Sequence, residues 1–144
     1  MKVLSVVGNR PQFIKSGPVS SALRDAGIEE VGLHTGQHWD PELSDVFYAE
    51  LGLPEPAYRL DLHTADAEAM RPAIAAALSA ERPDWVLVFG DTNSTRAGTG
   101  AAGDAGIPVA HVEDTHVIGN TRSGRWRAGL GHALGGSGSL PLIR

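Results

Sequence analysis

The sequence predicts a three-layer α/β fold, in which an open parallel sheet carries helices on both faces. Short apolar runs alternate along the chain with segments of helical pattern, and this alternation is typical of parallel sheets. Residues 84–89 (DWVLVF) are almost continuously apolar, as in a strand that is buried on both faces. Two helical segments, at 11–26 and 41–51, open with proline, which favours the first turn of a helix.

The first half of the chain supplies two strands as well as these two helices. Residues 2–7 are a short apolar run that ends at a glycine, and residues 30–35 form a second strand-like run. The helix at 11–26 is followed directly by Gly27, the residue type that commonly ends helices. Pro18 lies inside this helix, so we expect a kink or a break there.

The second half of the chain supplies a further pair of helices and a further pair of strands. Met70, Ile74 and Leu78 recur at intervals of four residues and form the apolar stripe of an amphipathic helix. A segment rich in glycine and alanine then predicts another helix. The expected elements are a helix at 66–80, a strand at 84–89, a helix at about 95–105 and a strand at 107–112.

The predicted sheet determines where functional residues are expected. Crossover connections between parallel strands are right-handed, so all strand-to-helix loops lie along one edge of the sheet. In this architecture ligands bind outside the carboxyl ends of the strands. Three loops at this edge are therefore candidates for a site.

Composition excludes several classes of protein. The 144 residues carry a formal net charge of −5, so a nucleic-acid partner is not expected. No apolar run approaches the roughly 20 residues of a membrane helix, and the run at 3–7 is too short for a signal peptide. The chain has no cysteine, which excludes disulfides and cysteine-based zinc sites. These features favour a cytoplasmic protein of one domain.

The composition changes sharply after Glu113. Residues 1–113 hold 8 basic and 16 acidic residues, whereas residues 114–144 hold 4 arginines and one acid. The second segment also contains seven glycines, and its apolar residues follow no clear period. We therefore expect a domain at 1–113 and a poorly ordered Gly- and Arg-rich tail at 114–144. Such a switch is typical of a frameshifted or truncated product.

The first candidate loop is GNRPQFIK, at residues 8–15. Gly8 permits a tight turn after the first strand, and Pro11 opens the helix, whose free N–H groups attract anions. Arg10 and Lys15 add two cations near this helix end, and arginine can bind a phosphate through two hydrogen bonds. The pattern predicts a diphosphate contact. The alternative is an ordinary surface arginine beside a lysine whose stem lies on the protein surface.

The second candidate loop is HTGQHWD, at residues 34–40. Gln37 and His38 can both hydrogen-bond to a sugar or a phosphate. His34 and His38 are four residues apart, but they belong to a loop and have no fixed acidic third ligand. A metal site is therefore not expected here. The alternative is a polar loop that happens to hold two histidines.

The third candidate loop is GDTNST, at residues 90–95. Asp91 follows the buried strand, and four further polar residues lie at the start of the next helix. One of them must cap this helix whatever the function, which is the simpler explanation. Because a cap needs only one, the others are available for a ligand. If the strand that ends at Glu113 neighbours 84–89, Asp91 and Glu113 face one crevice, where two carboxylates can act as acid and base.

The motifs GNRPQFIK, TGQH, GDTNST and HVE occur here in the order and at the distances found in the non-hydrolysing UDP-N-acetylglucosamine 2-epimerases. The chain resembles the N-terminal part of that family over residues 1–113. The resemblance implies a Rossmann-like domain that forms one half of a glycosyltransferase-B fold. It also implies a reaction that converts UDP-GlcNAc to UDP-ManNAc by eliminating UDP and adding it back, without a metal or nicotinamide cofactor. Members of this family are usually homodimers, and their products serve cell-surface polysaccharide biosynthesis.

The resemblance implies roles for individual residues. Arg10 and Lys15 would hold the diphosphate, and Asp91 and Glu113 would be catalytic carboxylates. Gln37 and His38 would line the cleft, where bacterial relatives bind a second, regulatory UDP-GlcNAc.

The resemblance ends after Glu113. The family continues with Ala-Gly-Leu-Arg and a later Pro-Glu-Glu segment, which this chain lacks, and a second domain has no counterpart. We therefore expect an isomerase lineage whose 144-residue chain is inactive alone. A non-catalytic nucleotide-sugar binding module and a glycosyltransferase domain are the alternatives.

Overall fold

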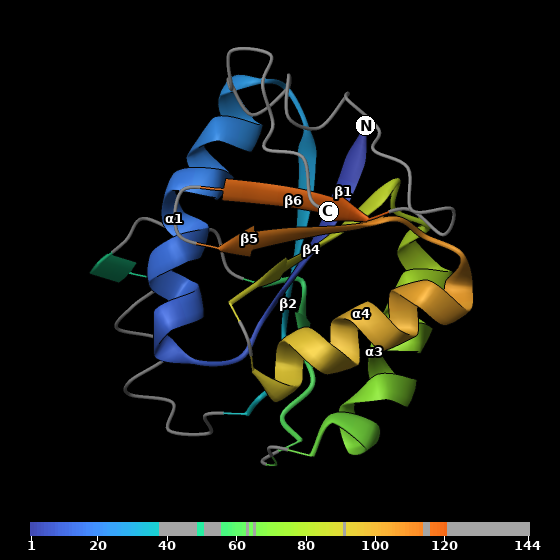
Figure 1. The fold of residues 1–144 in the computed structure, drawn as a ribbon. Helices are drawn as coiled ribbons and strands as arrows, with labels where there is room; N and C mark the ends of the chain where they lie inside the picture. The colour runs from blue at the N-terminus through green and yellow to red at the C-terminus, as the bar shows by residue number, and fades with distance from the viewer. Residues whose placement is uncertain are drawn as a thin grey trace.

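The computed structural model describes residues 1–37, 49–50, 56–62, 64, 66–90, 92–113 and 116–120. Six strands form one sheet in the order β3–β2–β1–β4–β5–β6 (Figure 1). The first five of these strands are parallel, and β6 runs antiparallel to β5. The strands are β1 (Lys2–Val7), β2 (Glu29–His34), β3 (Tyr58–Arg59), β4 (Trp85–Phe89), β5 (Val109–Glu113) and β6 (His116–Asn120).

Helices cover both faces of the sheet, so the predicted three layers are confirmed. α1 (Arg10–Asp25) lies on one face, and α3 (Ala67–Glu81) and α4 (Asn93–Ala105) lie together on the other (Figure 1). One apolar cluster joins the sheet to α1, and a larger one joins it to α3 and α4. The stripe predicted in α3 is fully part of this second core, because its members are at most 1% exposed: Met70, Ile74 and Leu78.

The central strands explain why their sequences are continuously apolar. Successive side chains of a strand point to opposite faces. In β1, Val3 and Val7 therefore pack toward α1, while Leu4 and Val6 pack toward α3 and α4. All five residues of β4 are buried in the same way. Two-sided burial predicts the parallel arrangement that the pairing of β1 with β2 and β4 confirms.

Helix α1 differs from the sequence-based expectation in two details. It begins one residue earlier, at Arg10, with Asn9 as its N-cap, and the Asn9 side chain accepts a hydrogen bond from Gln12 N–H. Of the kink or break expected at Pro18, the break is wrong, because the helix continues through this residue. Gly27 follows the helix with a φ of 71°, a left-handed conformation that glycine adopts at no steric cost.

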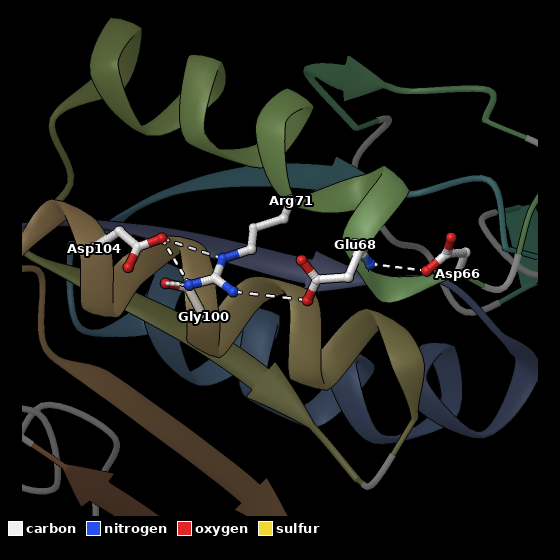
Figure 2. Close-up of polar contacts among 5 residues, drawn as sticks. All are labelled: Asp66, Glu68, Arg71, Gly100 and Asp104. Atoms are coloured by element: carbon white, nitrogen blue, oxygen red, sulfur yellow. Dashed lines mark hydrogen bonds and ion pairs between the residues drawn. The ribbon is translucent and has the colours of Figure 1, made fainter.

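Helices α3 and α4 are joined by a network around Arg71 (Figure 2). The guanidinium of Arg71 donates to Asp104 Oδ2 from Nε at 3.1 Å and from Nη2 at 2.7 Å, and Nη1 lies 3.7 Å from Glu68 Oε1. A side chain at Gly100 would meet this guanidinium at about 3.0 Å, so glycine lets it lie against α4. The pair is exposed and contributes little to stability, but it fixes how α4 lies on α3.

A second polar group lies at the end of α3. The Tyr58 hydroxyl donates to Glu81 Oε1 at 2.7 Å, and Lys2 Nζ lies 3.2 Å from Glu81 Oε2. The hydrogen bond from Tyr58, and then the one from Lys2, lowers the pKa of the Glu81 carboxyl below its ordinary value. This group ties the end of α3 to β1 and β3, and so it is structural.

Two predicted features lie largely outside the described residues. Of the helix expected at 41–51, only residues 49–50 are described, and they are helical. The tail expected at 114–144 is described only for 116–120, which form β6. This strand was not predicted, and it extends the sheet beyond the boundary expected at residue 113. The domain boundary itself stays a prediction.

The position of β6 leads to a test of that boundary. A chain that ends at residue 120 should be more stable than one that ends at 113, by about 1–3 kcal/mol of unfolding free energy, because β6 satisfies the backbone groups along the edge of β5. Urea denaturation of the two purified chains measures the difference. Equal stability would mean that the folded unit ends at 113, as the composition alone suggests.

Candidate ligand-binding site at the carboxyl edge of the sheet

The candidate loops meet where the strand order reverses direction. From β1 the chain passes to β2 and β3 on one side, and later returns to β4 and β5 on the other. The loops that follow β1 and β4 therefore lead to helices on opposite faces of the sheet. Ligands of open α/β sheets bind at such a switch point. Both α1 and α4 begin there, so two helix N-termini with partial positive charge face it.

Gly8 allows the loop after β1, the loop after β2 and the first turn of α4 to come into contact at this point. A Cβ atom at Gly8 would overlap Ser94 Oγ, in the first turn of α4, and Thr35 Oγ1, on the loop after β2. The hydroxyls of Thr35 and Ser94 are themselves 2.9 Å apart, and neither residue is exposed. The requirement for glycine here is thus one of space, in addition to the turn that the sequence indicates.

Gln12 connects the loop after β1 to the turn after β4. Its Oε1 accepts from Gly8 N–H at 2.7 Å, and its Nε2 donates to Phe89 O at 2.7 Å and to Thr92 Oγ1 at 2.7 Å. Thr95 Oγ1 lies 3.1 Å from the same nitrogen. The residue is 1% exposed, so its amide is internal to the protein. Gln12 was not among the predicted site residues, because a glutamine in the first turn of a helix is ordinarily exposed.

More of the polar residues at the start of α4 form hydrogen bonds within the protein than expected. Thr92 is the N-cap and forms a reciprocal capping box with Thr95. Ser94 N–H and Oγ donate to Gln37 Oε1 at 3.3 Å and 2.6 Å. The expectation that only one residue serves the cap is therefore wrong. Gln37 is predicted to bind a ligand. Its side-chain oxygen accepts hydrogen bonds from Ser94 of α4, so its side-chain nitrogen is the group that could contact a ligand.

More of the backbone N–H groups at the start of α1 are hydrogen-bonded within the protein than expected. Gly8 N–H is bound by Gln12, and Gln12 N–H is bound by Asn9 Oδ1 at 3.3 Å, while Pro11 has no N–H. The expected row of free backbone donors is thus wrong for these positions. An anion at this end would depend on the helix dipole and on side-chain cations.

Lys15 lies over the turn that precedes Asp91. Its Nζ is 3.8 Å from the position that a Cβ atom on Gly90 would occupy. Gly90 has a φ of 64°, its N–H donates to Val112 O at 3.0 Å, and its carbonyl contacts His111 Nε2. Because a carbonyl only accepts, this contact assigns the proton to Nε2 of His111. The turn is therefore held from the β5 side as well as from the α1 side.

The predicted site residues can now be placed. Lys15 and Gln37 lie at the switch point, and the backbone of Arg10 begins the helix there. Glu113 ends β5, which is the parallel neighbour of β4 that the prediction for this residue assumed. Asp91 and His38 lie outside the described residues, and the roles of all six stay predictions. The contacts of Gln12, Thr35 and His111 were missed, because nothing in the sequence indicates which polar residues face one another.

Within the part of the chain that the structure describes, no group of His, Cys, Asp and Glu is suited to hold a metal ion. The described helices also include none that is long and apolar enough to cross a membrane.

The fold and site define a class of protein: an α/β domain of the kind found in nucleotide-sugar enzymes. The family profile described as UDP-N-acetylglucosamine 2-epimerase matches residues 21–115, and the chain belongs to this family. A UDP-2,3-diacetamido-2,3-dideoxy-D-glucuronate 2-epimerase of Pseudomonas aeruginosa is 43% identical over 118 residues, which are 78% of this chain and 33% of the relative. A UDP-N-acetylglucosamine 2-epimerase homolog of Methanococcus maripaludis is 46% identical over 117 residues, 78% of this chain and 32% of the relative.

Solved structures agree with this assignment. The UDP-GlcNAc 2-epimerase of Methanocaldococcus jannaschii, in complex with UDP-GlcNAc and UDP, matches with a TM-score of 0.71 and 35% identity, over 78% of this chain and 32% of that one. The Streptomyces glycosyltransferase SsfS6 matches with a TM-score of 0.54 and 20% identity, over 78% of this chain and 39% of that one, a likeness of fold alone. The chain spans about a third of the length of the curated relatives it matches.

Proposed function

We propose that this chain supplies the N-terminal half of a non-hydrolysing UDP-sugar 2-epimerase, and that it binds the UDP portion of the substrate at the switch point between β1 and β4. The observation that carries the proposal is the meeting of the start of α1 with the turn after β4 there. The first turns of α1 contain Arg10 and Lys15, and the turn after β4 precedes Asp91. Cations beside the two helix N-termini suit a diphosphate.

The substrate class follows from the relatives. Their names identify UDP-linked sugars that carry an acetamido group at C2, the carbon that is inverted. The P. aeruginosa relative acts on a sugar with a second acetamido group at C3. We therefore propose a UDP-linked 2-acetamido sugar as the substrate, with UDP-GlcNAc as its simplest member.

The chemistry needs carboxylates and cations together. A base removes the proton from C2, the electrons of that C–H bond form a C1=C2 double bond, and the C1–O bond breaks so that UDP leaves with its electron pair. UDP then adds back as C2 is protonated on the other face. Asp91 and Glu113 are the proposed acid–base carboxylates, since carboxyls in one partly closed site can hold different pKa values. Arg10 and Lys15 are proposed to stabilise the negative charge of the departing diphosphate.

Further proposals concern the residues that line the ligand cleft, the oligomeric state and the cellular location. Gln37, through its amide nitrogen, and His38 are proposed to line the ligand cleft. A homodimeric assembly, which the resemblance implies, and a cytoplasmic location, which the composition favours, are also proposed. A non-catalytic UDP-sugar binding module is the second candidate, and it is favoured by the coverage of only about a third of the relatives.

The anion contact gives a direct test. Arg10→Ala should weaken UDP binding by roughly tenfold or more, because it removes a charge-assisted hydrogen bond worth about 1.5–3 kcal/mol. Isothermal titration calorimetry of the 144-residue chain with UDP measures the change. Arg24→Ala, which removes an exposed arginine from the other end of the same helix, is the matched control and should bind normally. Equal affinities for Arg10→Ala and the unmodified chain would contradict the proposed site.

A further inference from the structure

The side-chain amide of Gln12 lies between the two loops that carry the proposed functional residues. We propose that Gln12 is a positioning residue, which couples the loop of Arg10 to the turn of Asp91 so that an anion bound at the first is sensed at the second. This inference rests on the proposed function, because it assumes that a phosphate group binds beside Arg10.

The side-chain amide of Gln12 uses its hydrogen-bonding groups fully and has one possible orientation. Oε1 faces a group that can only donate, Gly8 N–H, and Nε2 faces a group that can only accept, Phe89 O, each at 2.7 Å. A flipped amide would lose both hydrogen bonds, so its orientation is fixed. The second proton of Nε2 points to Thr92 Oγ1 at 2.7 Å.

The hydrogen-bond partners of Gln12 lie in two separate segments, one before Arg10 and one around the turn after β4. Gly8 is two residues before Arg10, while Phe89 and Thr92 are on either side of positions 90 and 91. A displacement of the Gly8 amide must therefore move the Gln12 side chain or break its hydrogen bond. Movement of that side chain reaches the carbonyl and the hydroxyl that bracket the Asp91 turn.

The turn after β4 is also held from the side opposite Gln12, by residues of β5. Gly90 N–H donates to Val112 O at 3.0 Å, and Gly90 O contacts His111 Nε2. The turn thus lies between Gln12 and β5, and it can adjust only as these contacts allow. Because Gln12 is 1% exposed, its own amide cannot reach a ligand and responds only through the loops.

The test is an NMR titration of the ¹⁵N-labelled 144-residue chain with pyrophosphate, which has no aromatic ring to shift nearby signals through space. The side-chain amide signals of Gln12 should shift along with the backbone signals of Gly8 and Arg10, with the same dissociation constant. Shifts at Gly8 and Arg10 while the Gln12 side chain stays unchanged would overturn the coupling and leave the proposed function intact. No shift at any of these residues would count against both.

A variant isolates the contribution of Gln12. Gln12→Met keeps a side chain of similar length but removes both hydrogen-bonding groups. Pyrophosphate should still shift Gly8, while the shifts at Gly90 and Thr92 should be lost. Ser20→Ala removes another buried hydrogen bond of α1, to Glu30 Oε1 at 2.9 Å, and should keep all the shifts. Full shifts at Gly90 and Thr92 in Gln12→Met would overturn the proposal. If this variant fails to fold, the Gln12 side-chain amide signals of the unmodified chain still show whether the two segments are coupled.

Discussion

The 144-residue chain alone should convert UDP-GlcNAc to UDP-ManNAc at least about a thousandfold more slowly than a full-length relative. Holding the reacting groups in one geometry contributes roughly 7–11 kcal/mol in well-arranged sites, and losing half of it accounts for this factor. An open half-site also leaves the sugar in water, which weakens each electrostatic contact. The 144 residues span about a third of the length of the curated relatives.

The measurement is the formation of UDP-ManNAc, separated from UDP-GlcNAc, by purified chain and by the M. jannaschii enzyme under the same conditions. A fusion of residues 1–113 to the family continuation and second domain of a relative should restore turnover. In that fusion, Asp91→Asn and Glu113→Gln should each abolish turnover while leaving UDP binding largely unchanged. Turnover by the unmodified chain that scales with its concentration would show that it needs no second domain.

Gly8→Ala should destabilise the folded chain by about 1–3 kcal/mol or more, the range expected when a packed interior must accept an extra carbon. The added Cβ would overlap the hydroxyls of Thr35 and Ser94, which are buried and hydrogen-bonded to each other. It cannot be accommodated by a shift of the backbone alone, because Gly8 N–H is bound to the buried Gln12. The same substitution should weaken UDP binding, since it displaces the loop of Arg10.

Gly103→Ala is the matched control for Gly8→Ala. Gly103 lies inside α4, and a Cβ there would meet nothing within 4 Å. Alanine should therefore stabilise the chain by about 0.5–1 kcal/mol, because it restricts the unfolded state and favours helix. Urea denaturation of both variants should give opposite signs. A neutral effect of Gly8→Ala would mean that the three loops lie further apart than the structure shows.

The elements with a strong apolar pattern were predicted correctly. The continuous run of β4 and the stripe of Met70, Ile74 and Leu78 depend on burial against a sheet, which sequence periodicity reports directly. The parallel pairing of β1 to β5 was also predicted correctly, because the alternation of strands and helices in the sequence indicates it. Short elements were missed: β3 has two residues and β6 contains a glycine, so neither carries a pattern.

The candidate site was predicted only as far as its location. Residue types such as Thr92, Ser94 and Gln37 suit a ligand and a helix cap equally well, and only the fold shows which partner each has found. Gln12 illustrates the same limit, because the three partners of its side-chain nitrogen lie 77 to 83 residues away in the sequence. Sequence patterns indicate which face of an element is buried, but they do not specify pairwise contacts between loops.

The close approach of Gly8 to Thr35 and Ser94 has a consequence for how this site can change by mutation. Position 8 lies on the loop after β1, position 35 on the loop after β2 and position 94 in the first turn of α4, and the two hydroxyls limit the space at position 8. A library that varies position 8 alone would therefore recover almost only glycine. Variation at all three positions together would admit combinations, such as alanine at position 8 with smaller residues at positions 35 and 94, that no single substitution can reach.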